Sequence, residues 1–271
     1  MQRLLPSLEP LVTDASEHVR ASLGMSLSDL SESVGHAATL EKLLPLLLVL
    51  LRDEVSEVRL NVIGKLGGLQ GELGADELSQ ALLPAIMGLS NDSKWRTRLS
   101  IIEYLAVLAK HIGREFFKEK LVPLCISWLR DPVFSARKAA VQNIQRVGEV
   151  FGEEWSVAEL LPAIHELRAS SHFVDRLTSL YSYQAVLQTY SVASARAHVV
   201  AKVIESRRDP VANIRFVVVE TLVQFLRKSG GAAGADSAVV AAIAELAEDP
   251  DRDVRYNVKS VRCPHFLFGV I

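Results

Sequence analysis

The histidines are the side chains with the widest chemical range in this 271-residue chain, because a neutral imidazole can bind a metal ion and can also exchange a proton near pH 7. Metal sites on helices usually show two histidines at short spacing, as in HExxH. No such spacing occurs among His18, His36, His111, His165, His172, His198 and His265. The sequence therefore predicts no metal site and no histidine-based catalytic site.

Two glycine-rich stretches have the glycine content of phosphate-binding loops but not their other features. Gly67-Gly-Leu-Gln-Gly-Glu-Leu-Gly74 follows a helical pattern instead of a strand, and it lacks the Lys-Ser/Thr of a phosphate loop. Gly230-Gly-Ala-Ala-Gly234 has the same context. Both stretches are interpreted as linkers. Because Cys125 and Cys263 lie far apart and form no CxxC, the cysteines predict neither a disulfide framework nor a zinc knuckle. We expect no cofactor.

Composition narrows the classes of partner. A net charge of −2 and a pI of about 6.4 do not provide the basic surface that nucleic acid requires. The longest apolar run, Leu43 to Leu51, contains a proline and is about half as long as a membrane span. The first six residues, MQRLLP, lack the apolar region expected of a signal peptide. We therefore expect a protein of the cytoplasm or nucleus that binds neither nucleic acid nor membrane.

A repeat of 39 residues runs through the chain. Prolines recur in this register at Pro6, Pro45, Pro84, Pro123 and Pro162. An acidic series in phase with them comprises Asp14, Asp53, Asp92, Asp131, Asp209 and Asp249, with Ser170 at the fifth position. Six residues after each of these positions lies an arginine: Arg20, Arg59, Arg98, Arg137, Arg176, Arg215 and Arg255. These aspartates and arginines are interpreted as a structural ladder, in which turn carboxylates pair with arginines of adjacent repeats. Ser170 is expected to leave Arg176 without a turn acid of its own and available for other work.

Each repeat unit reads as two amphipathic helices joined by a short turn, because its apolar residues recur at helical spacing. The turn aspartate is expected to cap the second helix. In Asp131-Pro132, Asp209-Pro210 and Asp249-Pro250, the proline is expected at the first helical position. Since a single helical hairpin cannot bury both apolar faces, the units must stack. The prediction is an all-α fold without strands, a right-handed α-solenoid of about seven HEAT repeats. The expected boundaries are 1–36, 37–74, 75–113, 114–152, 153–191, 192–230 and 231–262, in one array with a divergent tail at 263–271.

Several strings are similar to the scaffold (A, PR65) subunit of protein phosphatase 2A. They lie in the same order as in that family: LRDEVSEVRLN from Leu51, KWRTRLSIIEY from Lys94, EFFKEKL from Glu115, FGEEW from Phe151 and DPVANIRF from Asp209. The similarity extends from about Leu40 to Asn257. The family has fifteen HEAT repeats, and these seven resemble its last seven, which form its C-terminal half.

The resemblance implies a non-catalytic scaffold that binds the phosphatase catalytic subunit through the inter-helix turns of repeats 3–7. The residues that match the family's contact positions are Trp95, Arg96, Phe134, Phe173, Arg176 and Val211. The family usually has tyrosine at the two phenylalanine positions, which puts any contact made by a hydroxyl in doubt. Binding of regulatory B-type subunits is expected to be reduced or lost, since these bind mainly to repeats that have no counterpart here.

Two alternatives remain open. One is a generic HEAT adaptor of the importin or vesicle-adaptor kind, which grips an acidic or helical ligand on its concave side. The other is an enzyme, because HEAT-type deoxyhypusine hydroxylases hold a di-iron site. That class carries several His-Glu pairs, whereas this chain has only His165-Glu166. Trp95 could also be buried under a neighbouring helix instead of being presented to a partner.

Overall fold

The computed structural model describes residues 5–69, 73, 75–110, 114–191, 193–228 and 237–261, and everything below refers to these residues. They form helices and turns and contain no strand, which confirms the predicted all-α class. None of the described helices is long and apolar enough to cross a bilayer. The expected tail at 263–271 and the expected linker at Gly230–Gly234 lie outside the described residues. The same holds for His111, Cys263 and His265, and for residues 70–72 and 74 of the other glycine-rich stretch.

The chain divides into two compact units, Met1–Asn143 and Ile144–Ile271. The helical segments of the first unit are α1 (Leu5–Leu8), the 3-10 turn η1 (Glu9–Thr13), α2 (Glu17–Val34), α3 (His36–Ala38), the π-helical turn η2 (Thr39–Leu43), α4 (Leu44–Leu50), α5 (Ser56–Lys65), the 3-10 turn η3 (Leu66–Leu69), α7 (Ala75–Leu89), α8 (Trp95–Leu108), α9 (Arg114–Phe116), the π-helical turn η4 (Phe117–Leu121), α10 (Val122–Trp128) and α11 (Phe134–Phe151). The division between the units falls inside α11.

The second unit continues the alternation of first and second helices. Its segments are α12 (Glu153–Glu159), α13 (Leu161–Arg168), α14 (Phe173–Thr189), α15 (Ala193–Glu205), the 3-10 turn η5 (Ser206–Arg208), α16 (Ala212–Lys228), α17 (Ser237–Ala247) and α18 (Arg252–Val261).

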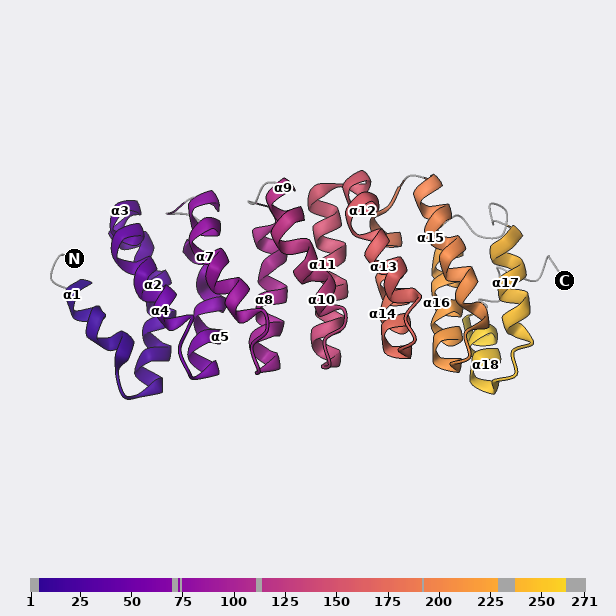
Figure 1. Cartoon of the computed structure of the whole chain (residues 1–271), viewed down its shortest axis with the longest axis horizontal. Helices are drawn as coiled ribbons and strands as arrows, with labels where there is room; N and C mark the ends of the chain where they lie inside the picture. The colour runs from indigo at the N-terminus through magenta and orange to yellow at the C-terminus, as the bar shows by residue number, and fades with distance from the viewer. Residues whose placement is uncertain are drawn as a thin grey trace. The chain divides into compact units, whose positions relative to one another are not determined.

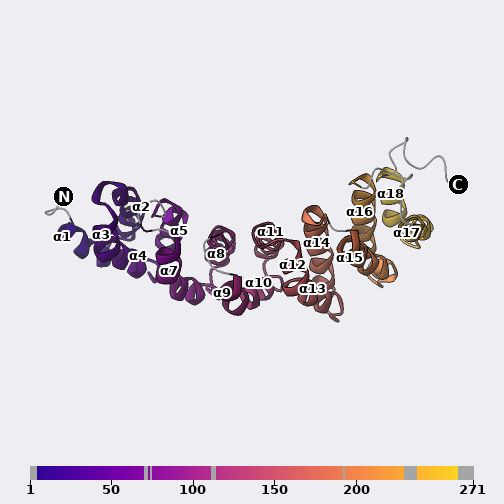
Figure 2. The same ribbon diagram turned by 90° about the horizontal axis from the view of Figure 1, so that it is seen from above.

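Within each unit the second helices of successive repeats pack side by side. In the first unit α2 contacts α5 and α5 contacts α8, and in the second unit α14 contacts α16 and α16 contacts α18 (Figure 1). Seen from above, the first helices of each unit form a second layer against them (Figure 2). Leu47 and Leu50 on α4 and Val62 on α5 are 0% exposed between the layers. Burial of such side chains stabilises the stack by roughly 1.5–3 kcal/mol each.

The periodic prolines shape the first helices. Proline has no N–H, and its ring collides with the carbonyl four residues earlier in a regular helix. Four residues before Pro45 and Pro123 the chain widens into the π-helical turns η2 and η4, after which a new α-helix begins. Pro162 lies at the start of α13, directly after the break that ends α12 at Glu159. In these three repeats the first helix is interrupted before its proline, whereas α7 continues through Pro84 as one helix.

The turn between the two helices of a repeat differs from the prediction in one respect. Each turn aspartate accepts the backbone N–H two residues later, over 2.7–2.9 Å. The second helices begin three residues after the aspartate, so the aspartate closes the turn and is not the N-cap residue. Likewise Pro132, Pro210 and Pro250 lie in the turn and not at the first helical position, which makes that prediction wrong. Proline fits there because its fixed φ suits the second residue of a turn.

Candidate protein-binding site at the inter-helix turns

The ladder arginines hold the turns in place from both sides. Nη1 of Arg98 donates to the backbone O of Asp92 in its own turn over 2.6 Å. Its Nε and Nη2 donate to the two carboxylate oxygens of Asp131 in the next turn, over 2.7 and 2.9 Å. The same two-sided arrangement recurs for Arg20 with Asp53, for Arg176 with Asp209 and for Arg215 with Asp249. Arg59 reaches Asp92 through Nη2 at 2.8 Å.

The paired charges neutralise each other. Hydrogen bonds from Arg215 hold the pKa of the Asp249 carboxyl below its usual range, although partial burial opposes the shift. For Asp131, burial would raise the pKa, but the hydrogen bonds from Arg98 and from the N–H of Val133 outweigh it, so the pKa is lowered. The Asp131 and Asp249 side chains are each 4% exposed. Such buried, doubly bonded carboxylates are suited to fixing the spacing of the turns, and poorly placed for exchange with a ligand.

The expectation that Ser170 frees Arg176 is wrong. Arg176 binds the carboxylate of Asp209 through two hydrogen bonds of 2.7 and 3.1 Å. Where the next turn has an aspartate, the ladder arginine reaches forward to it, 33 or 34 residues on, so a missing acid affects the arginine before it. That arginine is Arg137, which donates hydrogen bonds to the carbonyls of Asp131 and Pro132 in its own turn.

Trp95 and Arg96 open helix α8, directly after the turn that contains Asp92. The Trp95 side chain is half-buried, and the guanidinium carbon of Arg96 lies 4.5 Å from the centre of its ring. A cation at this distance over an indole face is attracted by the ring quadrupole. Arg96 itself is exposed. The pair therefore offers a preformed combination of aromatic surface and positive charge at the turn.

Phe134 and Phe173 occupy the same place in their repeats as Trp95, since each is the first residue of a second helix. Phe134 is 61% exposed and Phe173 45% exposed. The guanidinium of Arg137 lies 5.8 Å from the Phe134 ring. Val211 precedes α16, is half-buried, and donates its N–H to Asp209. Much of each ring is therefore accessible to a partner, and aromatic side chains together with arginines are typical of protein-binding hot spots.

Tyr256 was missed by the sequence reasoning. It lies on α18 and is 70% exposed, the largest exposure among the large apolar side chains of the described residues. The position one residue after the ladder arginine is occupied in the other repeats by Ala21, Leu60, Leu99, Lys138, Leu177 and Phe216. Because this position is apolar in most repeats, an aromatic residue there gave no distinguishing signal.

The structure also brings together two histidines that appeared scattered. Nε2 of His165 lies 3.2 Å from Nε2 of His198, and its Nδ1 lies 2.5 Å from the Tyr183 hydroxyl. The two histidines are 33 residues apart, the same separation as the ladder pairs, and this spacing could have identified them. Burial, and then the neighbouring His198, Lys202 and Arg168, lower the pKa of His165. No group of three or more potential metal ligands occurs in the part of the chain that the structure describes.

Comparison with known proteins supports the architecture. A family model described as HEAT repeat matches residues 43–71. No curated protein sequence matches the chain. Among solved structures, Kap95p, studied with RanGDP in nuclear import, matches with a TM-score of 0.75 at 12% identity over 95% of this chain. Importin beta matches with a TM-score of 0.67 at 15% identity over 96%, and Cex1p with a TM-score of 0.61 at 14% identity over 95%.

The matched structures are longer proteins. This chain spans 35% of the Kap95p and importin beta chains and 51% of the Cex1p chain. Identities at this level show a shared fold and do not transfer a partner. Together with the all-helical pairs described above, they show that the chain folds as a HEAT-repeat solenoid.

Proposed function

We propose that this chain is a non-catalytic scaffold or adaptor that binds a protein partner along its inter-helix turns. The observation that carries the proposal is the exposure of Phe134 and Phe173 at equivalent positions of two repeats. The ladder arginines and aspartates fix the turns, so the aromatic rings are held at defined positions without being part of the core. Preorganised aromatic side chains reduce the entropy lost on binding.

For the partner, we propose the catalytic subunit of a protein phosphatase 2A-type serine/threonine phosphatase. The support is the sequence resemblance described above, whose contact positions include Trp95, Arg96, Phe134 and Phe173. In the structure these residues lie at the start of second helices, and the first unit contributes the stacked Trp95–Arg96 pair. Arg176 enters the proposal with its charge already paired to Asp209, so it would act through packing and its remaining surface.

A second candidate is an adaptor of the importin or vesicle-adaptor kind. The structural comparisons favour this reading over the phosphatase reading, because the matched solenoids include Kap95p and importin beta. The two candidates differ in the surface used. A phosphatase scaffold would depend on the turn residues, whereas an adaptor of this kind would grip its ligand on the faces of the second helices.

Direct binding to purified partners distinguishes the candidates. The immobilised chain is offered purified phosphatase catalytic subunit in one experiment and Ran, with GDP or GTP, in another. We expect retention of the catalytic subunit with serine/threonine phosphatase activity in the eluate, and no retention of Ran. Retention of Ran without the phosphatase would establish the adaptor reading instead.

Substitution of Phe134 by Ala locates the surface. Because the ring is 61% exposed, we expect little change in the melting temperature, but a loss of partner affinity of about 2 kcal/mol, as for an interface anchor. Phe116 provides the matched control, since it is an exposed phenylalanine on α9, away from the turns. Equal effects of Phe134→Ala and Phe116→Ala would show that the turns are not the binding surface.

A further inference from the structure

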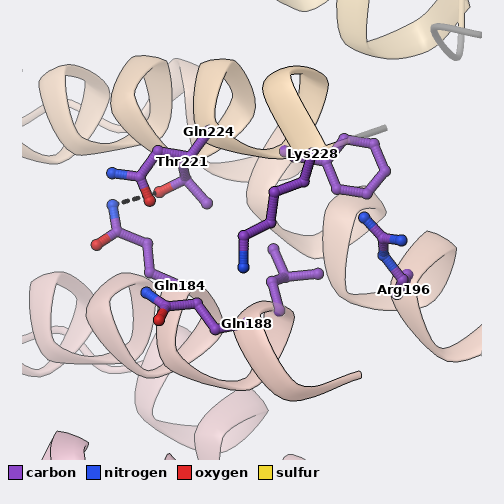
Figure 3. Close-up of a pocket in the computed structure, with 8 residues that line it drawn as sticks. Gln184, Gln188, Arg196, Thr221, Gln224 and Lys228 are labelled. Atoms are coloured by element: carbon purple, nitrogen blue, oxygen red, sulfur yellow. Dashed lines mark hydrogen bonds between the residues drawn. The ribbon is translucent and has the colours of Figure 1, made fainter. Parts of the chain in front are cut away.

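A small pocket opens between the second helices α14 and α16 of the second unit, with α15 at one end (Figure 3). The pocket is partly open to solvent. Leu187 forms its apolar floor, and its rim consists of amide, hydroxyl and cationic side chains: Gln184, Gln188, Arg196, Thr221, Gln224 and Lys228. None of these residues belongs to the turn site described above.

The rim has unused hydrogen-bonding capacity. Gln184 donates from Nε2 to the Thr221 hydroxyl over 2.9 Å, and this bond ties α14 to α16 and fixes the amide (Figure 3). Gln188, Gln224 and Lys228 are exposed and make no hydrogen bond or ion pair with other described residues. An amide side chain can donate to a peptide carbonyl and accept from a peptide N–H at the same time. The amides of Gln188 and Gln224 could therefore form hydrogen bonds with the N–H and C=O groups of an extended peptide.

The charged side chains that line the pocket are all positive. Arg196 and Lys228 are its charged residues, and no carboxylate lines the pocket. The guanidinium of Arg196 lies 5.1 Å from the centre of the Phe225 ring, which holds it beside the pocket, and the Lys228 ammonium points into the space between α14 and α16 (Figure 3). The neighbouring acid on α16, Glu220, lies one helical turn before Gln224, toward the other end of the pocket. Positive charge is thus concentrated at the Arg196–Lys228 end.

This combination is not a general property of the repeat. One repeat earlier, 39 residues before Gln188 and Lys228, the equivalent positions are Glu149 and Thr189. Gln145, the equivalent of Gln184, donates to Glu149 over 3.0 Å and is satisfied within its own helix. Helix packing therefore does not require the free amides and the cations at α14 and α16.

We propose that this pocket binds an extended acidic peptide segment of a partner protein. The amides of Gln188 and Gln224 would bond to its main chain, and the Lys228 ammonium would receive its carboxylates. The site is separate from the aromatic residues of the turns, so it would hold a second segment of the same partner or a different partner.

The test uses a fluorescein-labelled peptide with blocked ends and four consecutive glutamates flanked by glycine and serine, and an otherwise identical peptide with four glutamines. Binding to the full chain is measured by fluorescence anisotropy at low and high salt. We expect the glutamate peptide to bind more tightly than the glutamine peptide, with an affinity that falls as salt increases. Lys228→Gln should weaken binding by about fivefold or more, and Lys228→Arg should retain it.

Lys259→Gln is the matched control, because Lys259 is an exposed lysine on α18 outside the pocket and its substitution changes the net charge equally. Melting curves of the variants exclude loss of fold. Equal binding of both peptides, or equal weakening by Lys228→Gln and Lys259→Gln, would overturn the proposal. Phe134→Ala should leave peptide binding unchanged, so failure at this pocket is distinguishable from failure of the proposed turn site.

Discussion

At the scale of single residues, four ladder arginines, Arg20, Arg98, Arg176 and Arg215, each connect two turns. In Arg98, for example, one guanidinium nitrogen binds a carbonyl in the turn of its own repeat, and the other two nitrogens bind the acid of the next turn. This explains why an arginine recurs at the position, since lysine has no planar fork with which to reach both places.

Arg98→Ala and Arg137→Ala form a matched pair for this interpretation. Arg98, with a side chain 11% exposed, leaves the buried carboxylate of Asp131 without its partner when it is removed, so we expect a loss of about 3 kcal/mol of stability. Arg137 has Ser170 at the forward position and bonds to the carbonyls of its own turn, so its loss should cost about 1 kcal/mol. Urea unfolding of both variants measures the difference. Equal costs would show that the forward ion pair contributes little.

The histidine pair predicts a dependence of stability on pH. The pKa of His165 is lowered in the folded protein, so between that pKa and the unfolded value of about 6.5 the unfolded chain binds more protons. The free energy of unfolding should therefore fall as pH decreases through 6.5 and level off below the folded pKa. Urea unfolding at pH 7.5, 6.5 and 5.5 measures this fall.

His165→Gln should reduce the pH dependence, whereas His172→Gln, which changes an exposed histidine at the start of α14, should retain it. An unchanged dependence in His165→Gln would assign the proton uptake to other groups.

At the scale of the elements, close packing of the second helices depends on residue size at particular positions. A Cβ placed on Gly24 of α2 would lie 2.7 Å from Cγ2 of Val62 on α5, and Val62 is fully buried with a stiff, branched side chain. Gly24 therefore permits the contact between α2 and α5.

Gly24→Ala should destabilise the protein by roughly 1–3 kcal/mol, because the two helices must separate or Val62 must leave its preferred rotamer. Gly64 of α5 is the control, since nothing lies within 4 Å of a Cβ placed there. Gly64→Ala should stabilise the helix by about 0.5–1 kcal/mol. Thermal unfolding of both variants shows whether each substitution raises or lowers the stability. A stabilising Gly24→Ala would contradict the packing argument.

The helix pairs could be predicted from the sequence because the same apolar spacing and the same Pro, Asp and Arg positions recur in successive repeats. The 39-residue period therefore located the first and second helices. The details that depend on backbone geometry could not be predicted, namely the π-helical turns before Pro45 and Pro123 and the placement of Pro132 in the turn. Both features depend on the proline ring, because the local backbone conformation decides which carbonyl the ring would collide with.

Contacts between repeats were harder to predict than the repeats themselves. Arg176 was expected to be available because its own turn has Ser170 in place of an acid, whereas its guanidinium binds Asp209 of the next turn. The direction in which the arginines pair is not visible in a periodic sequence. The pocket at α14 and α16 was missed because glutamines have no strong pattern. Comparison of Gln188 and Lys228 with Glu149 and Thr189 one repeat earlier would have marked it as unusual.

At the scale of the whole molecule, the stability of each repeat should depend mainly on its contacts with the adjacent repeats, because a repeat packs only against its neighbours. Leu180 of α14 is 0% exposed, and α14 contacts α13, α15 and α16 within the second unit. Leu180→Ala should cost about 3 kcal/mol and act mainly on these helices. In hydrogen exchange measured by mass spectrometry, we expect faster exchange in α13, α14 and α16, with little change in α2 and α5.

Val62→Ala supplies the reciprocal case, since Val62 is also 0% exposed and α5 contacts α2 and α8 in the first unit. It should accelerate exchange in α2, α5 and α8 and leave α14 and α16 protected. A uniform increase in exchange along the chain for either variant would mean that the protein opens as one cooperative body. Local increases would mean that a turn site in one unit and the pocket in the other can be altered separately, which the proposed binding experiments require.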